Sequence, residues 1–486
     1  MDYPTFPPDF LWGVSTSAFQ IEGATTEAGR GPSTWDTFTA TDGKIARGED
    51  AKVAADHYHR YSEDVALMEE LGVGAYRMSI AWPRIQPTGT GKPRAEGLAF
   101  YDKLIDEVCG AGIDPVVTLY HWDTPQALED EGGWLNRDTA KHFAEYATVL
   151  GEHFADRVKL WIPLNEPMVM SIYGYGIGEY APGRTLLLDA LPTAHHQNLA
   201  HGLATQALRA AGATGIGTAN NHSPIWPADA EATEAQAWLD ALLNRTFADP
   251  VLLGTYPEQI HPLLPENFEA DLPTIRQPLD FYGVNYYEPQ CVAAPGAGNP
   301  LPFELRPIEG YPMTTNGSPI VPHGLRELLV SFKDRYGAAS HPGSSAVEFD
   351  SASAGGSTSA GFDSASAGKS TSAGCDSASA GGSASAGLPP VYVTENGCSF
   401  ADEPDETGRV HDPERIEFLD RHLRAVREAM DAGVDVRGYF VWSLLDNFEW
   451  SKGYAPRFGL VHVDYETQRR TPKDSFTWYR KLVRHE

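Results

Sequence analysis

The chain has 486 residues, of which 42% are hydrophobic and 11% aromatic, so it is long and apolar enough to bury a large core. Its 37 basic and 66 acidic residues give a net charge of -29, which repels nucleic-acid phosphates and anionic lipids. Neither nucleic acid nor a membrane is therefore an expected partner, and the acidity itself is no evidence of catalysis.

The opening residues lack a basic region followed by an apolar run, and no stretch of about 18 uninterrupted apolar residues occurs, so a soluble cytoplasmic protein is predicted. The cysteines form no CxxC or Cys/His metal pattern, and no HExxH occurs among the 16 histidines. We therefore predict free thiols, no metal and no cofactor. The oligomeric state is left open. The cysteines are Cys109, Cys291, Cys375 and Cys398.

Short β-branched and aromatic runs alternate with segments of helical period, a pattern typical of a parallel sheet with helical crossovers. Eight strand and helix units fit one closed (β/α)8 TIM barrel with extended loops, and no GxGxxG follows the first strand. The predicted helices lie near residues 61–71, 97–111, 138–155, 194–211, 233–247, 323–336, 412–432 and 473–484. The predicted strands are Phe10–Val14, Ala75–Ile80, Pro115–Tyr120, Lys159–Glu166, Gly215–Asn221, Asp280–Tyr287, Val391–Gly397 and Val436–Leu444.

Residues 349–387 interrupt this pattern with three copies of a 13-residue unit rich in Ser, Ala and Gly, just before the seventh strand. The unit has too little apolar surface to offset the entropy of folding, so a flexible insertion within a single domain of residues 1–486 is predicted. It enters at the amino end of the strand, whereas active sites of such barrels lie at the carboxyl ends. We expect it to be dispensable for catalysis.

Polar residues follow several predicted strands at their carboxyl ends, where the loops of such a barrel form the binding face. Glu166 and Glu395 follow two of these strands and should project into the same mouth. Either glutamate alone would be interpreted as a solvated surface acid. Together, two carboxylates that flank one bond are what glycoside cleavage requires.

These segments resemble glycoside hydrolase family 1, the β-glucosidase family, from about Phe10 to Tyr479. Six motifs in the family order carry the resemblance, and together they are far more specific than one NEP tripeptide. They are Phe19-Gln20-Ile21-Glu22-Gly23, Tyr76-Arg77-Met78-Ser79-Ile80-Ala81-Trp82, Tyr120-His121-Trp122-Asp123, Asn165-Glu166-Pro167, Thr394-Glu395-Asn396-Gly397 and the run from Trp442 to Trp450.

The resemblance implies a retaining β-glucosidase in which Glu166 is the acid/base and Glu395 the nucleophile. Retention requires carboxyl groups about 5 to 5.5 Å apart, with environments that push their two pKa values in opposite directions. The residues implied to orient the nucleophile are Arg77, Asn285 and Tyr287. The residues implied to bind the sugar are Gln20, His121, Trp122, Asn165, Tyr287, Trp442, Glu449, Trp450 and Phe458.

Within this set, the resemblance places Trp442 beneath the sugar ring, predicts a cis peptide at Trp442-Ser443, and lets Phe458 close the pocket. The Glu449 carboxylate disfavours 6-phosphorylated sugars. Departures from the family pattern put the leaving-group preference in doubt: Met168 and Ser318 stand where tryptophans are usual, and Tyr180 where a histidine is common. A β-galactosidase, a β-fucosidase, a transglycosylase and a sugar-binding pseudoenzyme remain alternatives.

Overall fold

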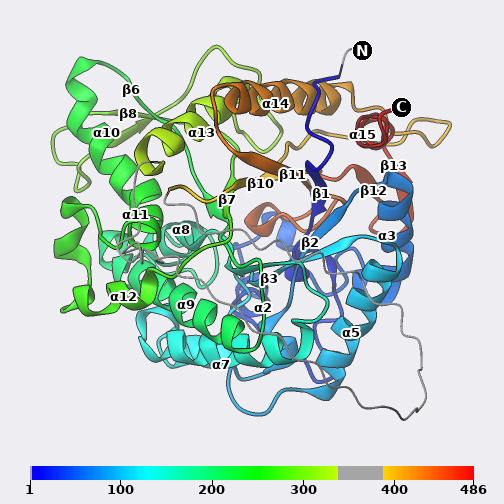
Figure 1. Cartoon of the computed structure of the whole chain (residues 1–486), viewed down its shortest axis with the longest axis horizontal. Coiled ribbons are helices and arrows are strands. Elements are labelled where there is room, and N and C mark those ends of the chain that lie inside the picture. The colour runs from blue at the N-terminus through cyan, green and yellow to red at the C-terminus, as the bar shows by residue number, and fades with distance from the viewer. Residues whose placement is uncertain (1–2, 338–386) are drawn as a thin grey trace, which may run out of the picture.

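The computed structural model describes residues 3–337 and 387–486. Its centre is a sheet of eight parallel strands in the order β4-β3-β2-β1-β11-β10-β7-β5, which lies inside a ring of helices (Figure 1). The strands are β1 (Leu11–Ser15), β2 (Ala75–Ser79), β3 (Asp114–Tyr120), β4 (Leu160–Leu164), β5 (Asn220–Asn221), β7 (Tyr282–Asn285), β10 (Val391–Asn396) and β11 (Val436–Trp442).

Residues 215–219, which lead into β5, join β4 and close the sheet. The amide of Trp161 donates to the carbonyl oxygen of Gly215 at 2.8 Å, and the amide of Gly217 donates back to Trp161 at 2.9 Å. At the other end, the amide of Glu166 donates to the carbonyl oxygen of Ala219 at 2.8 Å. Each strand thus neighbours the strands before and after it in the chain, and the predicted (β/α)8 barrel is confirmed.

Helices surround the barrel at the predicted places (Figure 1). One prediction was too simple: residues 233–247 form no single helix but two helices joined by a π-helical turn, Ala241–Arg245, and the second runs on to Leu252. The helices are α3 (His57–Leu71), α5 (Ala95–Gly110), α7 (Asp138–Phe154), α9 (Leu191–Ala210), α10 (Thr233–Asp240), α11 (Thr246–Leu252), α13 (Pro322–Tyr336), α14 (Pro413–Asp431) and α15 (Asp474–Arg484).

Several predicted strands are shorter than expected, the fourth and fifth among them. The fifth is regular only at Asn220–Asn221: Ile216 and Ala219 form isolated bridges, and Gly215 at its start adopts φ +68°, outside the strand region. The fourth stops at Leu164, because Glu166 has a left-handed φ of 45°. The left-handed conformation of Glu166 matters for function, since it turns the chain at the barrel mouth.

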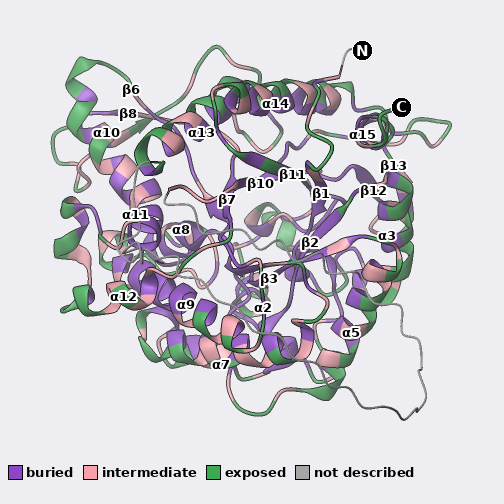
Figure 2. Ribbon diagram, viewed as in Figure 1, coloured by how far each residue is buried: buried purple, intermediate pink, exposed green. Residues whose placement is uncertain are grey.

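The strands are buried on both sides, as a parallel sheet requires. Their inward side chains fill the barrel, and their outward side chains pack against the helices, whose outer faces are exposed (Figure 2). On α14, for example, Leu419, Leu423 and Val426 are fully buried. One cluster of buried side chains combines residues from six different strands or strand ends, namely Ala75, Val116, Ile162, Ala219, Phe281 and Phe440.

Two small sheets lie outside the barrel. β12 (Val461–Val463) pairs with β13 (Arg470–Pro472), while β8 (Gln290–Ala293) lies between β6 (Ile225–Pro227) and β9 (Glu304–Arg306). The first follows β11, and the second follows β5 and β7. Both therefore extend the loops at the carboxyl ends of barrel strands.

The repeat at 349–387 lies, apart from Gly387, outside the described residues, so the flexible insertion stays a prediction. Its flanks are described: a Cβ added to Gly387 would lie 2.9 Å from the carbonyl oxygen of Gly337, so the two ends meet at the amino end of β10. Within residues 3–337 and 387–486, no helix combines the length and apolar character that a membrane crossing needs.

Candidate active site

Glu395 lies at the carboxyl end of β10 with only 3% of its surface exposed. One carboxylate oxygen forms an ion pair with Arg77 of β2, and the other accepts a hydrogen bond from the Tyr287 hydroxyl at 2.8 Å. The same Arg77 nitrogen donates to the carbonyl oxygen of Thr394 at 3.1 Å, which fixes the guanidinium against β10. Both donors stabilise a negative charge on Glu395, as a nucleophilic carboxylate needs.

Glu166 lies two residues beyond the end of β4, and its left-handed backbone places it at the barrel mouth. Burial, followed by the nearby charge of Glu395, raises the pKa of Glu166. A hydrogen bond from Asn285 Nδ2 to Glu166 Oε1, 2.7 Å long, opposes this shift without cancelling it. Glu166 is thereby kept protonated near neutral pH, which is the state that a general acid needs.

Asn285 does not occupy the place expected from the sequence. It was predicted to orient the nucleophile, but its amide donates to Glu166 and, at 3.1 Å, to Asn165. The side-chain oxygen of Asn285 accepts a hydrogen bond from the Thr394 hydroxyl at 2.7 Å. Asn285 is thus linked to Glu395 only through Thr394, the residue before it. The strand order allows this, because β7 pairs with β10 and only β5 separates it from the end of β4, so Asn285 can reach both Thr394 and Glu166.

Asn165 hydrogen bonds to Arg77, which contacts Glu395, and to Asn285, which contacts Glu166. Its side-chain oxygen accepts from Arg77 Nη2 at 2.6 Å and from Asn285 Nδ2 at 3.1 Å, and its amide nitrogen lies 3.1 Å from His121 Nε2. Burial and the charge of Arg77 hold the pKa of His121 well below its usual value, so this imidazole is neutral. The ring nitrogen can then accept the amide proton of Asn165. The network links both glutamates through fixed hydrogen bonds.

The two glutamates line one cavity of about 310 Å³ at the carboxyl ends of the strands. A cavity of this size holds a sugar ring and part of a leaving group. Seven of the predicted sugar-binding residues also line it, namely His121, Trp122, Tyr287, Trp442, Glu449, Trp450 and Phe458. The other predicted residues, Gln20, Arg77, Asn165 and Asn285, each hydrogen bond to a residue that lines the cavity.

Gln20 forms a hydrogen bond with Glu449, which lines the cavity. Gln20 Nε2 donates to Glu449 Oε2 at 3.3 Å, and the Gln20 carbonyl accepts from the Ser17 hydroxyl at 2.6 Å, which fixes the orientation of the amide. Burial raises the pKa of Glu449 to about 8, in spite of the opposing charge of Lys452. A protonated carboxyl both donates and accepts hydrogen bonds, so this pair suits two neighbouring sugar hydroxyls.

Aromatic rings form the remaining wall. His121 stacks between Trp442 and Trp450, with centroid distances of 5.7 and 5.9 Å, and Trp122 contacts Trp450 at 4.5 Å. The predicted cis peptide between Trp442 and Ser443 is present. Such a wall offers the flat apolar surface on which a sugar ring stacks.

The comparisons with known proteins agree with this geometry. The model of glycosyl hydrolase family 1 matches residues 2–342 and 384–486. The chain belongs to glycosyl hydrolase family 1. It is 43% identical over 487 residues to thermostable β-glucosidase B of Thermobispora bispora, covering 99% of this chain and 91% of the relative. It is 39% identical over 489 residues to 1,4-β-D-glucan glucohydrolase of Thermotoga neapolitana, covering 99% and 98%.

Solved structures of the family have the same fold. The β-glucosidase from Thermotoga maritima in complex with deoxynojirimycin superposes with a TM-score of 0.85 at 39% identity, covering 99% of this chain and 98% of that one. Family 1 membership makes the chain a glycoside hydrolase with a TIM-barrel fold.

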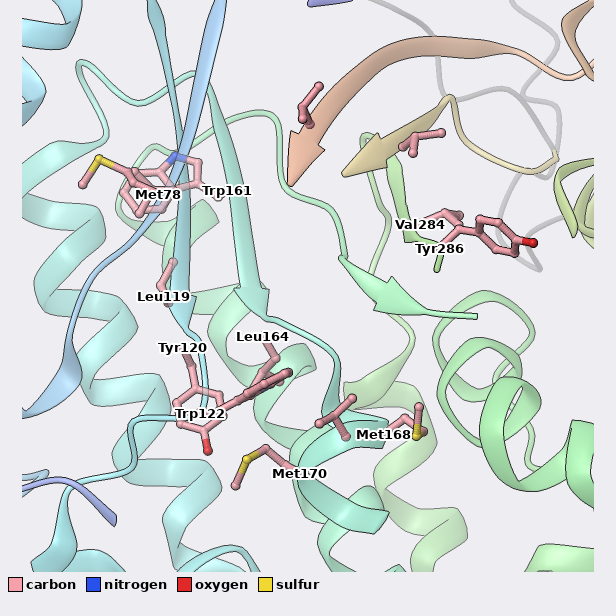
Figure 3. Packing of buried hydrophobic residues seen from close by; sticks show 14 of the residues in the cluster. Met78, Leu119, Tyr120, Trp122, Trp161, Leu164, Met168, Met170, Val284 and Tyr286 are labelled. Carbon is pink, nitrogen blue, oxygen red and sulfur yellow. The ribbon is translucent and has the colours of Figure 1, made fainter. Parts of the chain in front are cut away.

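The family 1 site contains cavity residues that sequence reasoning missed. They include Tyr173, Glu179, Glu288, Gln290, Asn316 and Lys452. Two of these follow residues that were predicted: Glu288 comes directly after Tyr287, and Lys452 two residues after Trp450. Met168, on the short helix α8 (Pro167–Val169), lies with Leu164 and Met170 among the apolar side chains gathered where β3 and β4 end (Figure 3).

Gly397 is required where the chain leaves the nucleophile strand. A Cβ at this position would lie 1.7 Å from the carbonyl oxygen of Trp442, so any larger residue pushes the two strand ends apart. Because a displacement of about 1 Å costs on the order of 100-fold in rate, Gly397→Ala is expected to lower kcat by about 10- to 100-fold. The measurement is steady-state hydrolysis of an aryl β-glucoside.

A matched control is available for this substitution. A Cβ on Gly110, at the end of α5, meets no atom within 4 Å, so Gly110→Ala should leave kcat unchanged and the Tm equal or slightly higher. Wild-type kcat in Gly397→Ala would contradict the close approach of the two strand ends.

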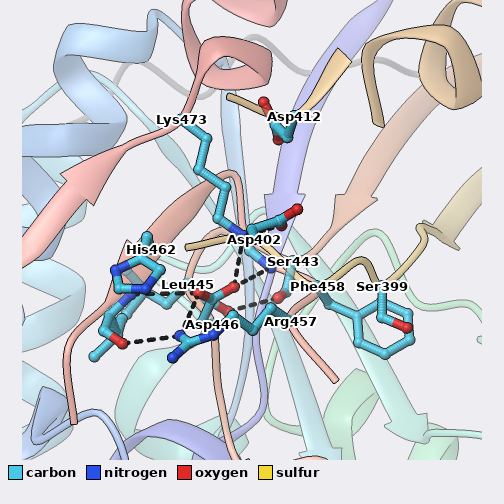
Figure 4. Close-up of polar contacts among 12 residues, drawn as sticks. Ser399, Asp402, Asp412, Ser443, Leu445, Asp446, Arg457, Phe458, His462 and Lys473 are labelled. Atoms are coloured by element: carbon cyan, nitrogen blue, oxygen red, sulfur yellow. Dashed lines mark hydrogen bonds and ion pairs between the residues drawn. The ribbon is translucent and has the colours of Figure 1, made fainter. Parts of the chain in front are cut away.

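A buried network of charges adjoins the loop that carries Glu449. Asp446 Oδ1 accepts from Lys473 Nζ at 2.8 Å, and Asp446 Oδ2 accepts from Arg457 Nη1 at 2.9 Å (Figure 4). Lys473 Nζ also donates to Asp402 at 2.7 Å. Burial alone would raise the pKa of Asp446, but the charges of Lys473 and Arg457 outweigh it and hold that pKa below its usual value.

Arg415 of α14 extends the network toward the cavity. It pairs with Asp402 and, at 2.9 Å, with Asp412. Its Nη1 donates to the carbonyl oxygens of Cys398 and Phe458, the second at 3.2 Å. Cys398 follows Gly397, and both Cys398 and Phe458 line the cavity. The network therefore ties the end of the nucleophile strand to the segment that closes the pocket.

Metal binding has no structural support in the described part of the chain. Among those residues, no group of three or more His, Cys, Asp or Glu side chains is arranged to hold an ion. The two glutamates and their hydrogen-bonding partners supply the acid, the nucleophile and the charge that a glycoside cleavage needs.

Proposed function

We propose that the chain is a retaining β-glucosidase that hydrolyses terminal β-D-glucosyl residues by double displacement, with Glu395 as nucleophile and Glu166 as acid/base. One observation carries the proposal: two buried glutamates line a single cavity in opposite environments. Glu395 has a cation and a phenol against its carboxylate, whereas the pKa of Glu166 is raised. Family 1 membership supports the same assignment.

In the first half-reaction, Glu395 attacks the anomeric carbon and the bond to the leaving oxygen breaks. Glu166 transfers its proton to that oxygen, so the leaving group departs as a neutral alcohol. The product is a glucosyl ester on Glu395. Arg77 and Tyr287 lose their anionic partner as the ester forms, and their donors then help the carboxylate to leave again in the second step.

In the second half-reaction, Glu166 acts as a base, because the loss of charge on Glu395 changes its pKa. The negative charge of Glu395 is one cause of the raised pKa of Glu166, and it vanishes when the ester forms. The pKa of Glu166 therefore falls, and the ionised carboxylate can take a proton from the incoming water. Water attacks the anomeric carbon, glucose leaves with its β configuration, and both glutamates return to their starting states.

The sugar is assigned as glucose from the names of the relatives and from the polar end of the cavity. The Gln20 and Glu449 pair supplies hydrogen-bonding groups for the outer hydroxyls of the sugar. Both groups can hydrogen bond either epimer at the fourth hydroxyl, so β-galactoside and β-fucoside cleavage remain candidate activities. A role in cellulose breakdown is proposed from the relative named 1,4-β-D-glucan glucohydrolase.

Proton NMR of the hydrolysis of an aryl β-glucoside tests the proposal directly. Release of the β-anomer of glucose first, followed by mutarotation, is the expected course. First release of the α-anomer would overturn the double displacement, and binding without turnover would favour a pseudoenzyme. A panel of aryl β-glucosides, β-galactosides and β-fucosides then ranks kcat/KM for the three sugars.

The pH profile provides an independent test of Glu166. Because its pKa is raised, kcat/KM should stay high below that pKa and fall as the pH rises through it, since ionised Glu166 cannot protonate the leaving oxygen. Glu166→Gln should lower kcat/KM for an alkyl glucoside by roughly 100- to 10,000-fold. With 2,4-dinitrophenyl β-glucoside, whose leaving group needs no proton, the variant should lose the high-pH fall altogether.

Finally, we propose a cytoplasmic location. It is supported by Cys291 and Cys398, which are free thiols within the described part of the chain, as is usual in a reducing compartment. Fractionation of the producing cells, with activity found outside the cytoplasmic fraction, would overturn it.

A further inference from the structure

A second cavity, of about 360 Å³, lies outside the catalytic site. Most of its lining comes from α10, α13 and the segment around β6, which lie together at one side of the molecule (Figure 1). Ser223 is the one described residue that lines both cavities, and Ile225 of the second cavity pairs with Gln290, which lines the catalytic one. The second cavity therefore adjoins the catalytic cavity and is separate from it.

Three aromatic side chains form a cluster at the molecular surface. They are Trp226 of β6, Tyr311 in the loop between β9 and α13, and His323 near the start of α13. The Trp226 and His323 rings are stacked, with centroids 5.6 Å apart and planes 10° apart, and the Tyr311 ring lies 5.8 Å from that of His323. His323 is exposed and the other two are half-buried, so the aromatic cluster presents ring surface to solvent.

Glu327 of α13 connects the aromatic cluster to the second cavity. Its carboxylate accepts the indole N–H of Trp226 at 3.1 Å, and it lines the cavity. Ile225, directly before Trp226, lines the cavity as well. The hydrogen bond fixes the orientation of the indole, and a carboxylate with about four acceptor sites keeps capacity for hydroxyl donors from a ligand. The aromatic cluster and the second cavity are therefore two parts of one surface.

The polar lining of the second cavity favours a neutral ligand. Two acids and two bases balance its charge in the described part of the chain, namely Asp240, Glu327, Arg245 and Arg335. Arg335 lies 3.8 Å from Asp240, and Arg245 pairs with Asp249 at 2.9 Å, so both guanidinium groups already face a carboxylate. The net charge of -29 on the whole chain further disfavours an anion. Uncharged hydrogen-bonding groups also line the cavity, namely Thr233, Gln236 and Ser331.

An aromatic surface beside neutral hydrogen-bonding groups has the chemistry that binds a sugar chain. The apolar faces of glucose rings stack on aromatic side chains, while the hydroxyls at the ring edge need donors and acceptors. A single exposed aromatic residue is ordinary, but an exposed cluster rimmed by polar groups is typical of a binding surface. Trp226 and Glu327, hydrogen bonded to each other, supply both kinds of group next to the catalytic cavity.

We propose that the aromatic cluster and the second cavity form a surface site for a neutral β-glucan chain, distinct from the catalytic cavity. This inference rests on the proposed β-glucosidase function, which makes β-linked glucose the sugar that the protein meets. A chain held at this site keeps its ends near the catalytic cavity, which raises their effective concentration there. The site therefore favours polymeric and long oligomeric substrates without taking part in the reaction itself.

Affinity electrophoresis in native gels that contain a soluble mixed-linkage β-1,3-1,4-glucan tests the site. The wild type should migrate more slowly as the polymer concentration rises. Trp226→Ala should bind the polymer about 3- to 10-fold more weakly, because the stacking surface is lost. Its kcat/KM for 4-nitrophenyl β-glucoside should stay at the wild-type value, since Trp226 is not among the residues that line the catalytic cavity.

Further variants separate lost binding from a folding defect. Trp226→Phe keeps an aromatic ring on β6 and should bind the polymer more tightly than Trp226→Ala. His323→Ala removes an exposed ring and should also weaken binding. Tyr61→Ala, which removes a half-buried ring on α3 at the opposite side of the molecule from β6, is the matched control and should migrate like the wild type (Figure 1). Thermal melts of each variant confirm that the protein is folded.

The outcomes separate this inference from the proposed function. Equal retardation of the wild type and Trp226→Ala would overturn the surface site, because the polymer would then be held elsewhere. A wild type that hydrolyses 4-nitrophenyl β-glucoside but is not retarded would overturn the site and leave the function intact, whereas no hydrolysis would overturn the function itself. A dimer in sedimentation that Trp226→Ala converts to a monomer would make the aromatic cluster an interface between two copies, which also overturns the site.

Discussion

Replacement of Glu395 by alanine is expected to reduce kcat for an aryl β-glucoside by at least about 10,000-fold, as the loss of a covalent nucleophile does in other enzymes. The side chain lies in the cavity between Arg77 and Tyr287, and among the described residues that line the cavity no other carboxylate is held by this pair. Without it no glucosyl ester can form. Steady-state rates with 2,4-dinitrophenyl β-glucoside measure the loss.

Added azide should restore turnover of the Glu395→Ala variant. The truncated side chain leaves space for a small anion beside the Arg77 guanidinium, which attracts negative charge. Azide then attacks the anomeric carbon from the face that Glu395 used, so the product is α-glucosyl azide, identified by NMR. Glu152→Ala, an exposed acid on α7, is the matched control and should retain wild-type kcat.

Two results would remove Glu395 from its role. Undiminished hydrolysis by the alanine variant would show that another group attacks the sugar. A β-glucosyl azide product would show that azide enters from the leaving-group face, so that the cavity left by the truncation is not on the nucleophile side.

Most of the barrel could be predicted from the sequence because each buried parallel strand is an apolar run, and each helix carries an apolar stripe. The run Val391-Tyr392-Val393, followed by Thr394 and Glu395, marks both a strand and the residue at its end. The strand order then follows from right-handed crossovers between neighbours. Glu166 and Glu395 could be brought together by the same rule, since carboxyl ends of parallel strands meet at one face.

The contacts within the site could not be predicted in this way. Whether Asn285 serves Glu166 or Glu395 depends on rotamers and on small register shifts, such as the irregularity between Val393 and Glu395 in the pairing of β10 with β7. The resemblance assigned Asn285 to the nucleophile, and the structure places its amide on the acid/base. Sequence spacing carries no signal for such a choice.

The buried charge network around Lys473 could not be predicted from the sequence either. Lys473 begins a predicted helix, whereas Asp402, 71 positions earlier, lies in no predicted element, and each alone would be interpreted as an exposed charged residue. Only the folded chain shows that α14, the end of β10 and the segment before α15 converge on one buried cluster. Asp446 falls within the run from Trp442 to Trp450, but sequence spacing identifies none of its partners.

Substitution of Lys473 by methionine is expected to destabilise the protein by about 3 to 5 kcal/mol, because a buried ion pair loses one partner while the other charges stay. Lys473 is fully buried, and its ammonium contacts both Asp402 and Asp446. Without it, the cations Arg415 and Arg457 face three buried carboxylates, so one negative charge is uncompensated. The change is measured as the shift in the free energy and midpoint of guanidinium unfolding.

A control and a double variant distinguish lost charge from lost packing. Lys481→Met removes an exposed lysine on α15 and should change stability by less than about 0.5 kcal/mol. Adding Asp446→Asn to Lys473→Met should restore part of the stability, because it removes the uncompensated negative charge while keeping the shape of the side chain. If the double variant were less stable by the sum of the two single effects, packing rather than charge would be the cause.

The pH dependence of the Lys473→Met effect gives the sharpest test, and its sign follows from the carboxylates. In the wild type, the charges of Lys473 and Arg457 hold the pKa of Asp446 below its usual value, so this contribution to stability is present above the unfolded pKa and is lost as the pH falls. Without the lysine, burial acts with less opposition, and the pKa of Asp446 rises. The variant then gains a proton in the folded state at a pH where the wild type stays ionised. The stability difference between the two proteins should therefore be largest near neutral pH and shrink in acid, whereas a loss of packing alone would give a constant difference.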